Sequence, residues 1–590
     1  MNFRAITIEF PDAIRYHNKL LIFIKKMRKP MWWKNAVFYQ IYPRSFADAN
    51  GDGIGDIPGI TSKLDYLQWL GIDAIWLSPH YPSPQVDVGY DVADYTDVNP
   101  EYGTLDDFKT FLTEAHARNI RVILDMVLNH TSDKHQWFIE SKSSRDNPKR
   151  DWYIWRDPAE DGGRPNNWDS IFGGPAWEWD EATGQYYYHY FLKEQPDLNW
   201  RNPEVEQAMF NAMRFWLDMG VDGFRLDAIG TIFEDQHYRN HQSPYDAYDA
   251  LKAFWLGKEM NVSPEEVAKR FELHFGLQQD LPEIYDLMTR MRRLVDEYDA
   301  RLLIGETSDL RYLGTGKDRL HAVFNFDLLA KDRLTPELVR QNQQKWLVSV
   351  PRGAWFGNTL NNHDQSRVKT HYGDGVYDDQ LARIAAALML TLPGTPYLYY
   401  GEEIGMEDYA VQSFDEVRDM VAMVYRQLMS QDGRSDEQIL KDLATFSRDR
   451  CRTPMQWEDA PNAGFSPAGV RTWLPVHQNY VDGVNVATQE NDEQSLLNFY
   501  RQLIHVRKTT PALLDGSYTQ IDLQSTHYLG FLRQTDDETC VVLINFTPQT
   551  EPVAYRFNGG EVLFSSAGRS TIDAVTIDLQ PFEVLIVRVL

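Results

Sequence analysis

The sequence is poor in cysteine, in positive charge and in long hydrophobic runs. Only two of its 590 residues are cysteines, Cys451 and Cys540, so no disulfide framework is implied and we expect the two thiols to remain unpaired. Lys and Arg number 59 against 86 Asp and Glu, and the resulting net charge of −27 argues against nucleic acid or anionic membrane as a partner. Few cysteines fit a reducing compartment, and we expect a cytoplasmic protein.

The N-terminal segment lacks the pattern of a secretory signal. Its one apolar run covers residues 20–24, is too short to span a bilayer, and is followed by Lys25, Lys26, Arg28 and Lys29. A secretory signal has the charges first and a longer apolar stretch after them. Residues 1–30 are therefore predicted to be an extension upstream of a start at Met27 or Met31, with a short unrecognised leader as the alternative.

From Met31 onward, apolar runs that end in a polar or charged residue alternate with helical patterns. Helical periodicity is clear, for example, over 60–70, 105–117 and 205–217. Eight buried strands alternating with helices predict an α/β fold, a (β/α)8 barrel with its active site at the C-terminal strand ends. The eight predicted strands are 36–42, 72–78, 120–129, 221–227, 302–306, 322–327, 358–364 and 396–402.

Three long excursions and a change of pattern divide the chain into domains. Residues 131–198, rich in Trp, Tyr, Gly and Asn, are too long for a loop and predict a small inserted domain after the third strand. Helical insertions are expected at 231–300 and 404–490. Short alternating segments after about residue 514 predict a C-terminal antiparallel β domain. The expected division is an extension (1–30), a barrel (31–130 and 199–514), an inserted domain (131–198) and a C-terminal β-sandwich (515–590).

Three of the predicted strands end in carboxylates. The fourth ends with Arg225 and Asp227, which are two apart and so face the same side. We expect the arginine to keep Asp227 ionised, as a nucleophile requires. The fifth ends at Glu306 after four apolar or glycine residues, a setting expected to raise the pKa of an acid. The seventh supplies Asp364.

A single strand-end Asp is commonly a helix cap, but three acids at three strand ends are hard to explain as caps. One carboxylate that attacks the anomeric carbon and one that protonates the leaving oxygen are what retaining glycoside hydrolysis needs. The predicted roles are Asp227 as nucleophile, Glu306 as proton donor and Asp364 as a support for the sugar hydroxyls. The mechanism further predicts carboxyl groups of Asp227 and Glu306 about 5–5.5 Å apart.

Four blocks resemble, in order, the signature regions of the α-amylase superfamily, glycoside hydrolase family 13. They are the segments 125–130 (DMVLNH), 223–227 (GFRLD), 305–306 (GE) and 362–364 (NHD). The segments 33–43, 195–199 (QPDLN) and 452–457 (RTPMQW) are similar to the oligo-1,6-glucosidase branch of that family. The resemblance covers essentially residues 31–590.

The resemblance implies further roles in a pocket that admits only a terminal glucose. Asp87 would bind the glucose hydroxyls and pair with Arg452, closing the pocket and making cleavage exo-acting. The other substrate-binding residues implied are Tyr90, His130, Phe172, Phe191, Arg225 and His363. Without this context, the aromatic residues among them would be read as core.

A structural metal ion is also predicted. Residues 48–56 place oxygen ligands at alternate positions around glycines, and the expected ligands are Asp48, Asn50, Asp52, Ile54 and Asp56. Position twelve of the loop is Gly59, so this is no EF-hand, and a polar loop without metal is the alternative reading. The resemblance implies Ca²⁺ or Mg²⁺ in a structural role, with no organic cofactor.

The substrate is predicted less directly. In similar enzymes Val after the nucleophile accompanies α-1,6 preference, so Ala228 favours α-1,4 or sucrose-like glucosides, unless it merely packs. The predicted function is an exo-acting α-glucosidase acting on small oligosaccharides or disaccharides. A glucosyl transferase or isomerase such as trehalose synthase is the alternative, although the Arg-Leu-Asp-Arg-Asp run of sucrose isomerases is absent. A non-catalytic relative, the transporter heavy chain, fits poorly because all three acids are present. Oligomeric state is not predicted.

Overall fold

The computed structural model describes residues 31–257, 259–329, 333–522, 524–553, 555–556, 559–572 and 576–589. The predicted extension over 1–30 lies outside these residues. Within the described chain, no helix combines the length and the apolar character needed to cross a membrane. Cys451 and Cys540 are both buried and unpaired, as expected.

Eight parallel strands close into a barrel, which confirms the predicted (β/α)8 fold. Their order around the barrel is β1-β11-β10-β9-β8-β7-β3-β2, so the strands follow one another in sequence apart from the excursion between β3 and β7. The strands are β1 (Phe38–Ile41), β2 (Ala74–Leu77), β3 (Arg121–Val127), β7 (Gly223–Asp227), β8 (Leu302–Gly305), β9 (Ala322–Asn325), β10 (Trp355–Asn358) and β11 (Thr395–Tyr399).

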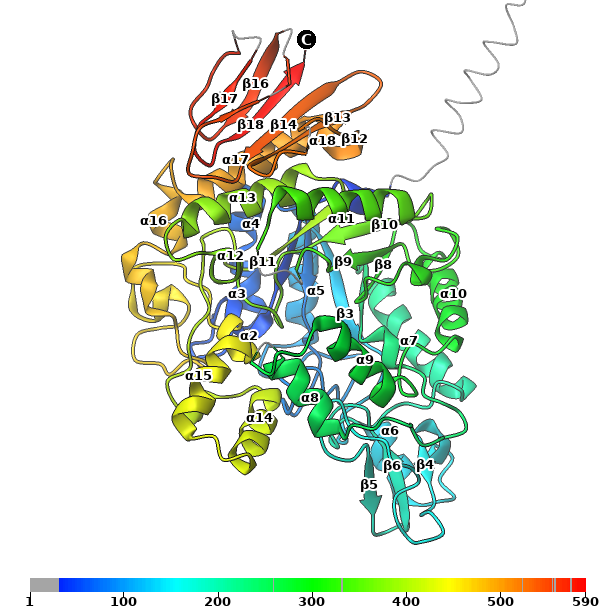
Figure 1. Cartoon of the computed structure of the whole chain (residues 1–590). Helices are drawn as coiled ribbons and strands as arrows, with labels where there is room; N and C mark the ends of the chain where they lie inside the picture. Colours follow the sequence, from blue (N-terminus) through cyan, green and yellow to red (C-terminus); the bar gives the residue numbers. More distant parts are fainter. Residues whose placement is uncertain are drawn as a thin grey trace, which may run out of the picture.

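Helices surround the barrel (Figure 1). Thr104 and Asp107 form a capping box at the start of α5, and α7 begins at an Asn202 cap and ends at Gly220, whose φ of 111° suits glycine. The helices of the barrel and of its connections are α2 (Pro43–Phe46), α3 (Ile57–Ser62), α4 (Leu64–Leu70), α5 (Leu105–Ala117), α7 (Pro203–Met219), α10 (Glu283–Val295), α11 (Pro336–Ser349), α12 (Val368–Tyr372), α13 (Asp378–Thr391), α16 (Val486–Glu490), α17 (Leu496–Thr509) and α18 (Pro511–Asp515).

The seventh strand was predicted wrongly. It was expected over 358–364, but β10 covers Trp355–Asn358 and the chain then leaves the sheet. After Asn358 the polar side chains bond to nearby backbone: the Thr359 hydroxyl donates to Asn361 O, and Asn362 Oδ1 accepts from the Asp364 amide. Such local bonds compete with strand pairing. Asp364 therefore lies in a loop beyond the strand end.

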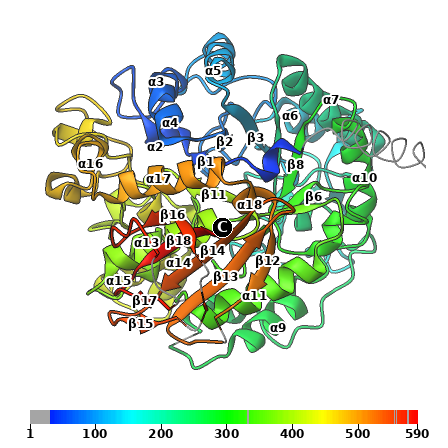
Figure 2. The ribbon, with the colours of Figure 1, turned by 90° about the horizontal axis from the view of Figure 1, so that it is seen from above.

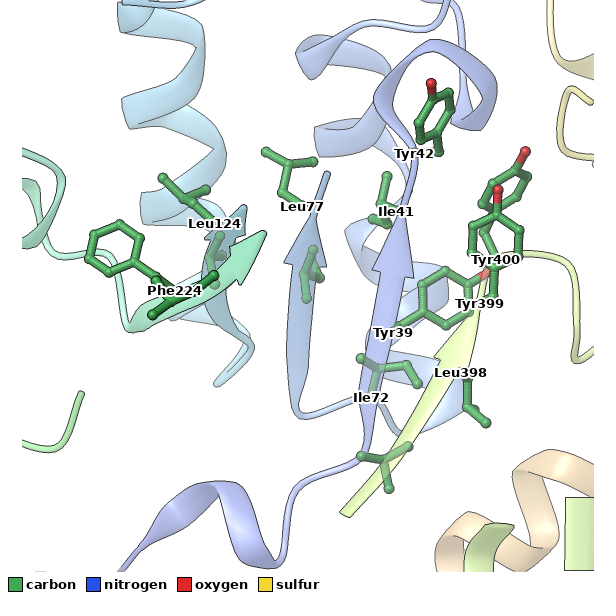
Figure 3. Close-up of a cluster of buried hydrophobic side chains, with 14 of the residues drawn as sticks. Tyr39, Ile41, Tyr42, Ile72, Leu77, Leu124, Phe224, Leu398, Tyr399 and Tyr400 are labelled. Atoms are coloured by element: carbon green, nitrogen blue, oxygen red, sulfur yellow. The ribbon is translucent and has the colours of Figure 1, made fainter. Parts of the chain in front are cut away.

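Strand alternation separates an outer core from a barrel interior. On β1, Tyr39 and Ile41 belong to the large cluster between strands and helices, part of which is drawn in Figure 3. Phe38 belongs to a second cluster that contains Ile304 and Phe324 and fills the barrel. Polar side chains follow on the inward positions nearer the strand ends, among them Asp125, Arg225 and Asp227. This polar layer is the floor of the candidate site.

The inserted domain after β3 packs at the end of the barrel to which the strands point (Figure 1). Its sheet has the order β4-β6-β5 and is accompanied by α6. The Leu198 amide donates to Asn129 O and the Thr131 amide to Pro196 O, so the QPDLN segment is tied to the end of β3. The elements are α6 (Gln136–Ser143), β4 (Trp155–Arg156), β5 (Trp177–Asp180) and β6 (Gln185–Tyr188).

Two helical insertions lie at the same end of the barrel as the inserted domain (Figure 1). The first, after β7, holds α8 (Ala247–Leu256) and α9 (Pro264–Phe275). The second, after β11, holds α14 (Met420–Gln431) and α15 (Asp436–Phe446). Apolar residues of α8, α14 and α15 share one cluster, so the insertions pack against each other although they are far apart in sequence.

The C-terminal domain is antiparallel, as predicted, and covers the opposite end of the barrel (Figures 1 and 2). A five-stranded sheet has the order β12-β13-β14-β18-β16, and β15 pairs with β17. Buried polar contacts fix the domain to the barrel helices: Arg533 Nη1 donates to Thr391 O at 2.6 Å and Arg340 Nη1 to Asp522 Oδ2 at 2.8 Å. The strands are β12 (Ser517–Gln520), β13 (Tyr528–Gln534), β14 (Thr539–Asn545), β15 (Glu551–Pro552), β16 (Gly560–Ser565), β17 (Asp578–Leu579) and β18 (Val584–Val589).

Candidate active site

Arg225 is the centre of the site. It projects from β7 and is 1% exposed. Its Nη1 donates to Asp125 Oδ1 and to Asp227 Oδ1, both at 2.6 Å, and its Nη2 lies 2.6 Å from Glu306 Oε1. The predicted nucleophile and the predicted proton donor are thus held side by side by one guanidinium group.

The charge balance of this cluster differs from the sequence-based expectation. Arg225 was expected to keep Asp227 ionised, but burial and the neighbouring Glu306 and Asp125 raise the pKa of Asp227 in spite of the arginine. Burial also raises the pKa of Asp125 to about 6. One guanidinium cannot balance several carboxylates in a buried space, so Asp125 and Asp227 hold protons more readily than exposed carboxyls do.

Glu306 follows β8 and reaches into the same space. Its Oε2 accepts a hydrogen bond from the Ala228 amide at 3.0 Å, so the backbone just after Asp227 fixes the second carboxylate. Ala228 has φ 41° and ψ 40°, a left-handed conformation that is uncommon for a residue other than glycine. The Glu306 side chain is 24% exposed, so a leaving group can approach it.

Asp364 is held in its ionised form. Arg452 Nη2 lies 2.6 Å from Asp364 Oδ1, and His363 Nε2 lies 3.3 Å from Asp364 Oδ2. Burial alone would raise the pKa of Asp364, but the positive charges of Arg452 and Arg448 lower it below its ordinary value. Asp364 is therefore suited to accept hydrogen bonds from sugar hydroxyls.

A hydrogen-bond chain under the cavity orients Tyr90. Burial lowers the pKa of His363 to about 3, so this imidazole is neutral. Gln40 Nε2 lies 2.8 Å from His363 Nδ1 and donates to it, which leaves the proton on Nε2, 2.5 Å from the Tyr90 hydroxyl. That hydroxyl donates to Asp125 Oδ2 at 3.2 Å. The inward position of Gln40 on β1 was its only sequence signal, and it was missed.

Asp87 pairs with a different arginine from the one predicted. Arg448 Nη2 donates to Asp87 Oδ1 at 2.9 Å and to Asp419 Oδ1 at 2.7 Å. Arg452, the predicted partner, instead donates from Nε to His363 O at 2.7 Å and from Nη2 to Asp364. Arg448 is the first residue of the 3₁₀ helix η6 (Arg448–Cys451) and lines the cavity, whereas Arg452 follows the helix and is completely buried. The predicted pair of Asp87 with Arg452 is therefore corrected to Asp87 with Arg448.

The inserted domain supplies one wall. Gln195 Nε2 lies 3.2 Å from Asp87 Oδ2 and 3.0 Å from His130 Nε2, so the first residue of the QPDLN segment links both predicted sugar-binding groups. Burial lowers the pKa of His130 to about 4, which keeps this ring neutral. The ring centroids of Phe172 and Phe191 lie 5.6 Å apart. Gln195 was noticed only as a family marker, not as a site residue.

The predicted residues meet in one cavity of about 420 Å³, a size typical of small-molecule sites. Arg225, His363 and Arg452 are not among its lining residues but contact those that are. Arg448 lines it although it was not predicted. The predicted residues that line the cavity are Asp87, Tyr90, His130, Phe172, Phe191, Asp227, Ala228, Glu306 and Asp364.

Residues 40–516 match the model of the α-amylase catalytic domain. The chain belongs to the α-amylase family. It is 39% identical to the oligo-1,6-glucosidase of Parageobacillus thermoglucosidasius, over 88% of this chain and 91% of that protein. It is 41% identical to a probable α-glucosidase of Rhizobium meliloti, over 88% and 90%. A variant of isomaltulose synthase from Erwinia rhapontici NX5 has the same fold, with a TM-score of 0.82 and 36% identity over 95% of this chain and 99% of that chain. The chain is accordingly a glycosidase, and its relatives support glucosidase activity.

The predicted metal loop folds its oxygens onto its own backbone. Asp48 accepts from the Gly51 and Gly53 amides, Asn50 Oδ1 from the Asp52 amide, and Asp52 Oδ1 from the Ile54 amide. Asp56 accepts from the Ala49, Asn50 and Gly59 amides and caps α3. These oxygens retain further lone pairs, and an all-oxygen set suits a hard dication.

The acids of this loop are not tightly grouped. Among the described residues, the only three His, Cys, Asp or Glu side chains with ligand atoms within 4.8 Å of one another are Asp169, His241 and His274, in a different region. A cation in the loop would thus depend on the Asn50 amide oxygen and the Ile54 carbonyl as well as on carboxylates.

Proposed function

We propose that this chain is an exo-acting, retaining α-glucosidase with Asp227 as nucleophile and Glu306 as acid and base. The observation that carries the proposal is the bridge from Arg225 to both carboxylates inside one cavity. Two neighbouring acids that flank the scissile bond are the arrangement that retaining hydrolysis requires.

In the first step, Asp227 would attack the anomeric carbon. Its Oδ1 is engaged by Arg225, which leaves Oδ2 to form the bond. The bond from the anomeric carbon to the glycosidic oxygen breaks, and Glu306 gives its proton to that oxygen. In the second step Glu306 takes a proton from water, the water oxygen attacks the same carbon, and the ester to Asp227 breaks. Asp364, held ionised, would bind the sugar hydroxyls throughout.

Exo action is supported by the closed inner end of the cavity. Asp87 is buried and bonded to Arg448, while Arg448 is bonded in turn to Asp419. A longer chain could not continue through these ion pairs, so only a terminal glucose fits against Asp87.

The linkage and the fate of the glucosyl group are open to direct test. Ala228 favours α-1,4 or sucrose-like substrates, whereas oligo-1,6-glucosidase is the name of a curated relative. The second candidate function is glucosyl transfer, because a similar structure belongs to an isomaltulose synthase whose natural substrate is sucrose. In that case a sugar hydroxyl would replace water in the second step.

Incubation with maltose, isomaltose, sucrose and trehalose, followed by separation of the products, tests the proposal. Free glucose as the main product supports hydrolysis, and isomerised disaccharide with little glucose would refute it in favour of transfer. Asp227→Asn should abolish turnover, because an amide cannot form the ester intermediate. Continued turnover by that variant would remove the nucleophile assignment.

We also propose that the loop 48–56 holds a structural Ca²⁺ or Mg²⁺ through Asp48, Asn50, Asp52, Asp56 and the Ile54 carbonyl. The cation would tie the loop after α2 to the barrel. It would take no part in the reaction, since none of these residues lines the catalytic cavity.

A further inference from the structure

The outer part of the catalytic cavity has a different chemistry from its glucose end. Its wall is built by the helical insertions and not by the barrel. We name as the collar the six lining residues that these helices contribute: Leu251, Phe254 and Trp255 from α8, Phe271 from α9, Val421 from α14 and Phe446 from α15. All six side chains are apolar, and four of them are aromatic.

The collar is an organised surface. Leu251, Phe254 and Trp255 are spaced i, i+3 and i+4 and so share one face of α8. The Phe254 and Phe271 ring centroids lie 5.4 Å apart, and the rings of Trp255 and Phe446 stack at 6.1 Å. Aromatic rings from two separate insertions are thus joined into one rim around the opening.

Part of this surface is open to solvent at the cavity mouth: Leu251 is buried and the other collar residues are half-buried, but Phe254 is exposed. Phe254 is 62% exposed, although a large aromatic side chain gains free energy by leaving water. Exposed apolar patches on otherwise polar molecules commonly mark binding sites. The patch is continuous with Asp227 and Glu306, because the same cavity is lined by both sets of residues.

Polar groups that could serve a second sugar are few here. Outside the glucose end, the polar residues lining the cavity are Gln365 and Arg450. Two of the three nitrogens of the Arg450 guanidinium are already engaged, with Nε donating to Asp408 at 3.0 Å and Nη1 to Ser447 O at 3.0 Å. Sugar hydroxyls that leave water without new partners are bound poorly. An apolar group loses nothing in the same place.

We propose that the collar is the binding site for the aglycone of the substrate, and that it selects apolar alkyl or aryl groups linked to α-glucose. This inference rests on the proposed α-glucosidase function. Water hydrolyses R–O–glucose to glucose and R–OH: Asp227 takes the glucosyl carbon, Glu306 protonates the oxygen of R–OH, and water completes the cycle. The group R lies against the collar while its oxygen lies at Glu306.

A series of n-alkyl α-D-glucosides from methyl to octyl tests the proposal on the full chain, below micelle-forming concentrations. Their leaving alcohols have nearly equal acidity, so the series varies apolar contact and little else. The kcat/KM should rise about fourfold per added methylene until the chain outgrows the collar, which makes butyl about 60-fold better than methyl. A flat or falling series overturns the proposal.

Variants locate the effect. Phe254→Ser should lower the ratio of kcat/KM for butyl over methyl glucoside about tenfold, and Phe254→Leu should largely preserve it. The matched control is Val348→Ser on α11, which removes an apolar side chain that is 83% exposed and absent from the cavity lining, and it should leave the ratio unchanged. An equal loss in the control, or none in Phe254→Ser, overturns the assignment.

The remaining outcomes separate this inference from the proposed function. Turnover of maltose or isomaltose with a flat alkyl series refutes only the aglycone site, whereas no turnover of any α-glucoside refutes the proposed function itself. A dimer in light scattering that dissociates on Phe254→Ser, together with a flat series, would identify the collar as an interface between copies and overturn the proposal.

Discussion

Arg448→Lys tests the closed end of the glucose pocket. The lysine keeps the positive charge but lacks the fork by which Arg448 contacts both Asp419 and Asp87. A hydrogen bond to a charged group contributes about 1.5–3 kcal/mol. If the lysine fails to hold Asp87 in place, kcat/KM for a disaccharide should fall about 10- to 150-fold.

A double-mutant cycle makes this prediction specific for the pair. Asp87→Asn is measured alone and together with Arg448→Lys, and the same cycle is run with Arg452→Lys. We expect a coupling free energy of about 1.5 kcal/mol or more between Asp87 and Arg448, and a coupling smaller by at least about 1 kcal/mol between Asp87 and Arg452. The difference follows from the contacts, since Arg452 bonds Asp364 and His363 O instead.

The assay is steady-state release of glucose, with circular dichroism to show that each variant is folded. Folding has to be checked because Arg448 is surrounded by carboxylates, and breaking a buried ion pair commonly costs about 3–5 kcal/mol. Equal coupling of Asp87 to both arginines, or stronger coupling to Arg452, would refute the assignment drawn from the structure.

Three further predictions concern linkage, pH and metal. Ala228→Val places a β-branched residue at φ 41°, which costs about 1–3 kcal/mol of stability. Because Val at this position accompanies α-1,6 preference in similar enzymes, the ratio of kcat/KM for maltose over isomaltose should fall at least about tenfold. An unchanged ratio would contradict the role given to Ala228. Burial raises the pKa of Glu402 from 4.5 to about 7, so the folded state binds the proton of this carboxyl more tightly than the unfolded state does. The resulting contribution to the free energy of unfolding, about 3 kcal/mol, is fully present below pH 4.5 and is lost as the pH rises through 7. Urea unfolding at pH 5 and pH 8 should show that Glu402→Gln reduces this loss, and parallel pH profiles for the two proteins would rule it out. Chelation by EDTA should lower the Tm, and millimolar Ca²⁺ should restore it; at a Ca²⁺ concentration of 100 times Kd the bound ion adds about 2.7 kcal/mol to the free energy of unfolding. The Tm of Asp48→Asn should respond to neither treatment. A wild-type Tm that responds to neither treatment would remove the metal proposal.

Much of the barrel was predictable because its strands are continuous apolar runs. Parallel strands covered on both faces need no polar alternation, so a run such as 302–305 stands out in sequence. The ends of these apolar runs also predicted the position of the active site, since the first polar residue after a run lies at the end of a strand. Asp227 and Glu306 were found in this way, and the structure brings both to Arg225.

The seventh strand shows the limit of that approach. At the strand end Asn358 bonds to Asn325 and to the Pro393 carbonyl, and beyond it Asn362 accepts from the Asp364 amide. A strand end read from polarity alone was therefore placed too late. Asp364 was still found, because the strand was predicted to reach it and the family pattern also contains it.

The pairing of the arginines between residues 448 and 452 could not be predicted by either approach. Three arginines stand at alternate positions of one short segment. Arg448 pairs with Asp87 and Asp419, Arg450 pairs with Asp408, and Arg452 pairs with Asp364. The spacing does not reveal which arginine meets which aspartate, because the pairing depends on how η6 packs against segments that are distant in the sequence. The collar is a similar case, since α8 and α15 meet only in three dimensions.

This division has a consequence for function. The groups proposed to break the bond come from barrel strands, whose geometry is fixed by the closed sheet. The groups proposed to select the aglycone come from the two helical insertions, which pack against each other and against the inserted domain at one end of the barrel. Insertions can change in sequence without disturbing Arg225 and its carboxylates, so the reaction is expected to be common to the relatives while the aglycone is not. The apolar collar is therefore the part of this chain from which its own substrate is best inferred.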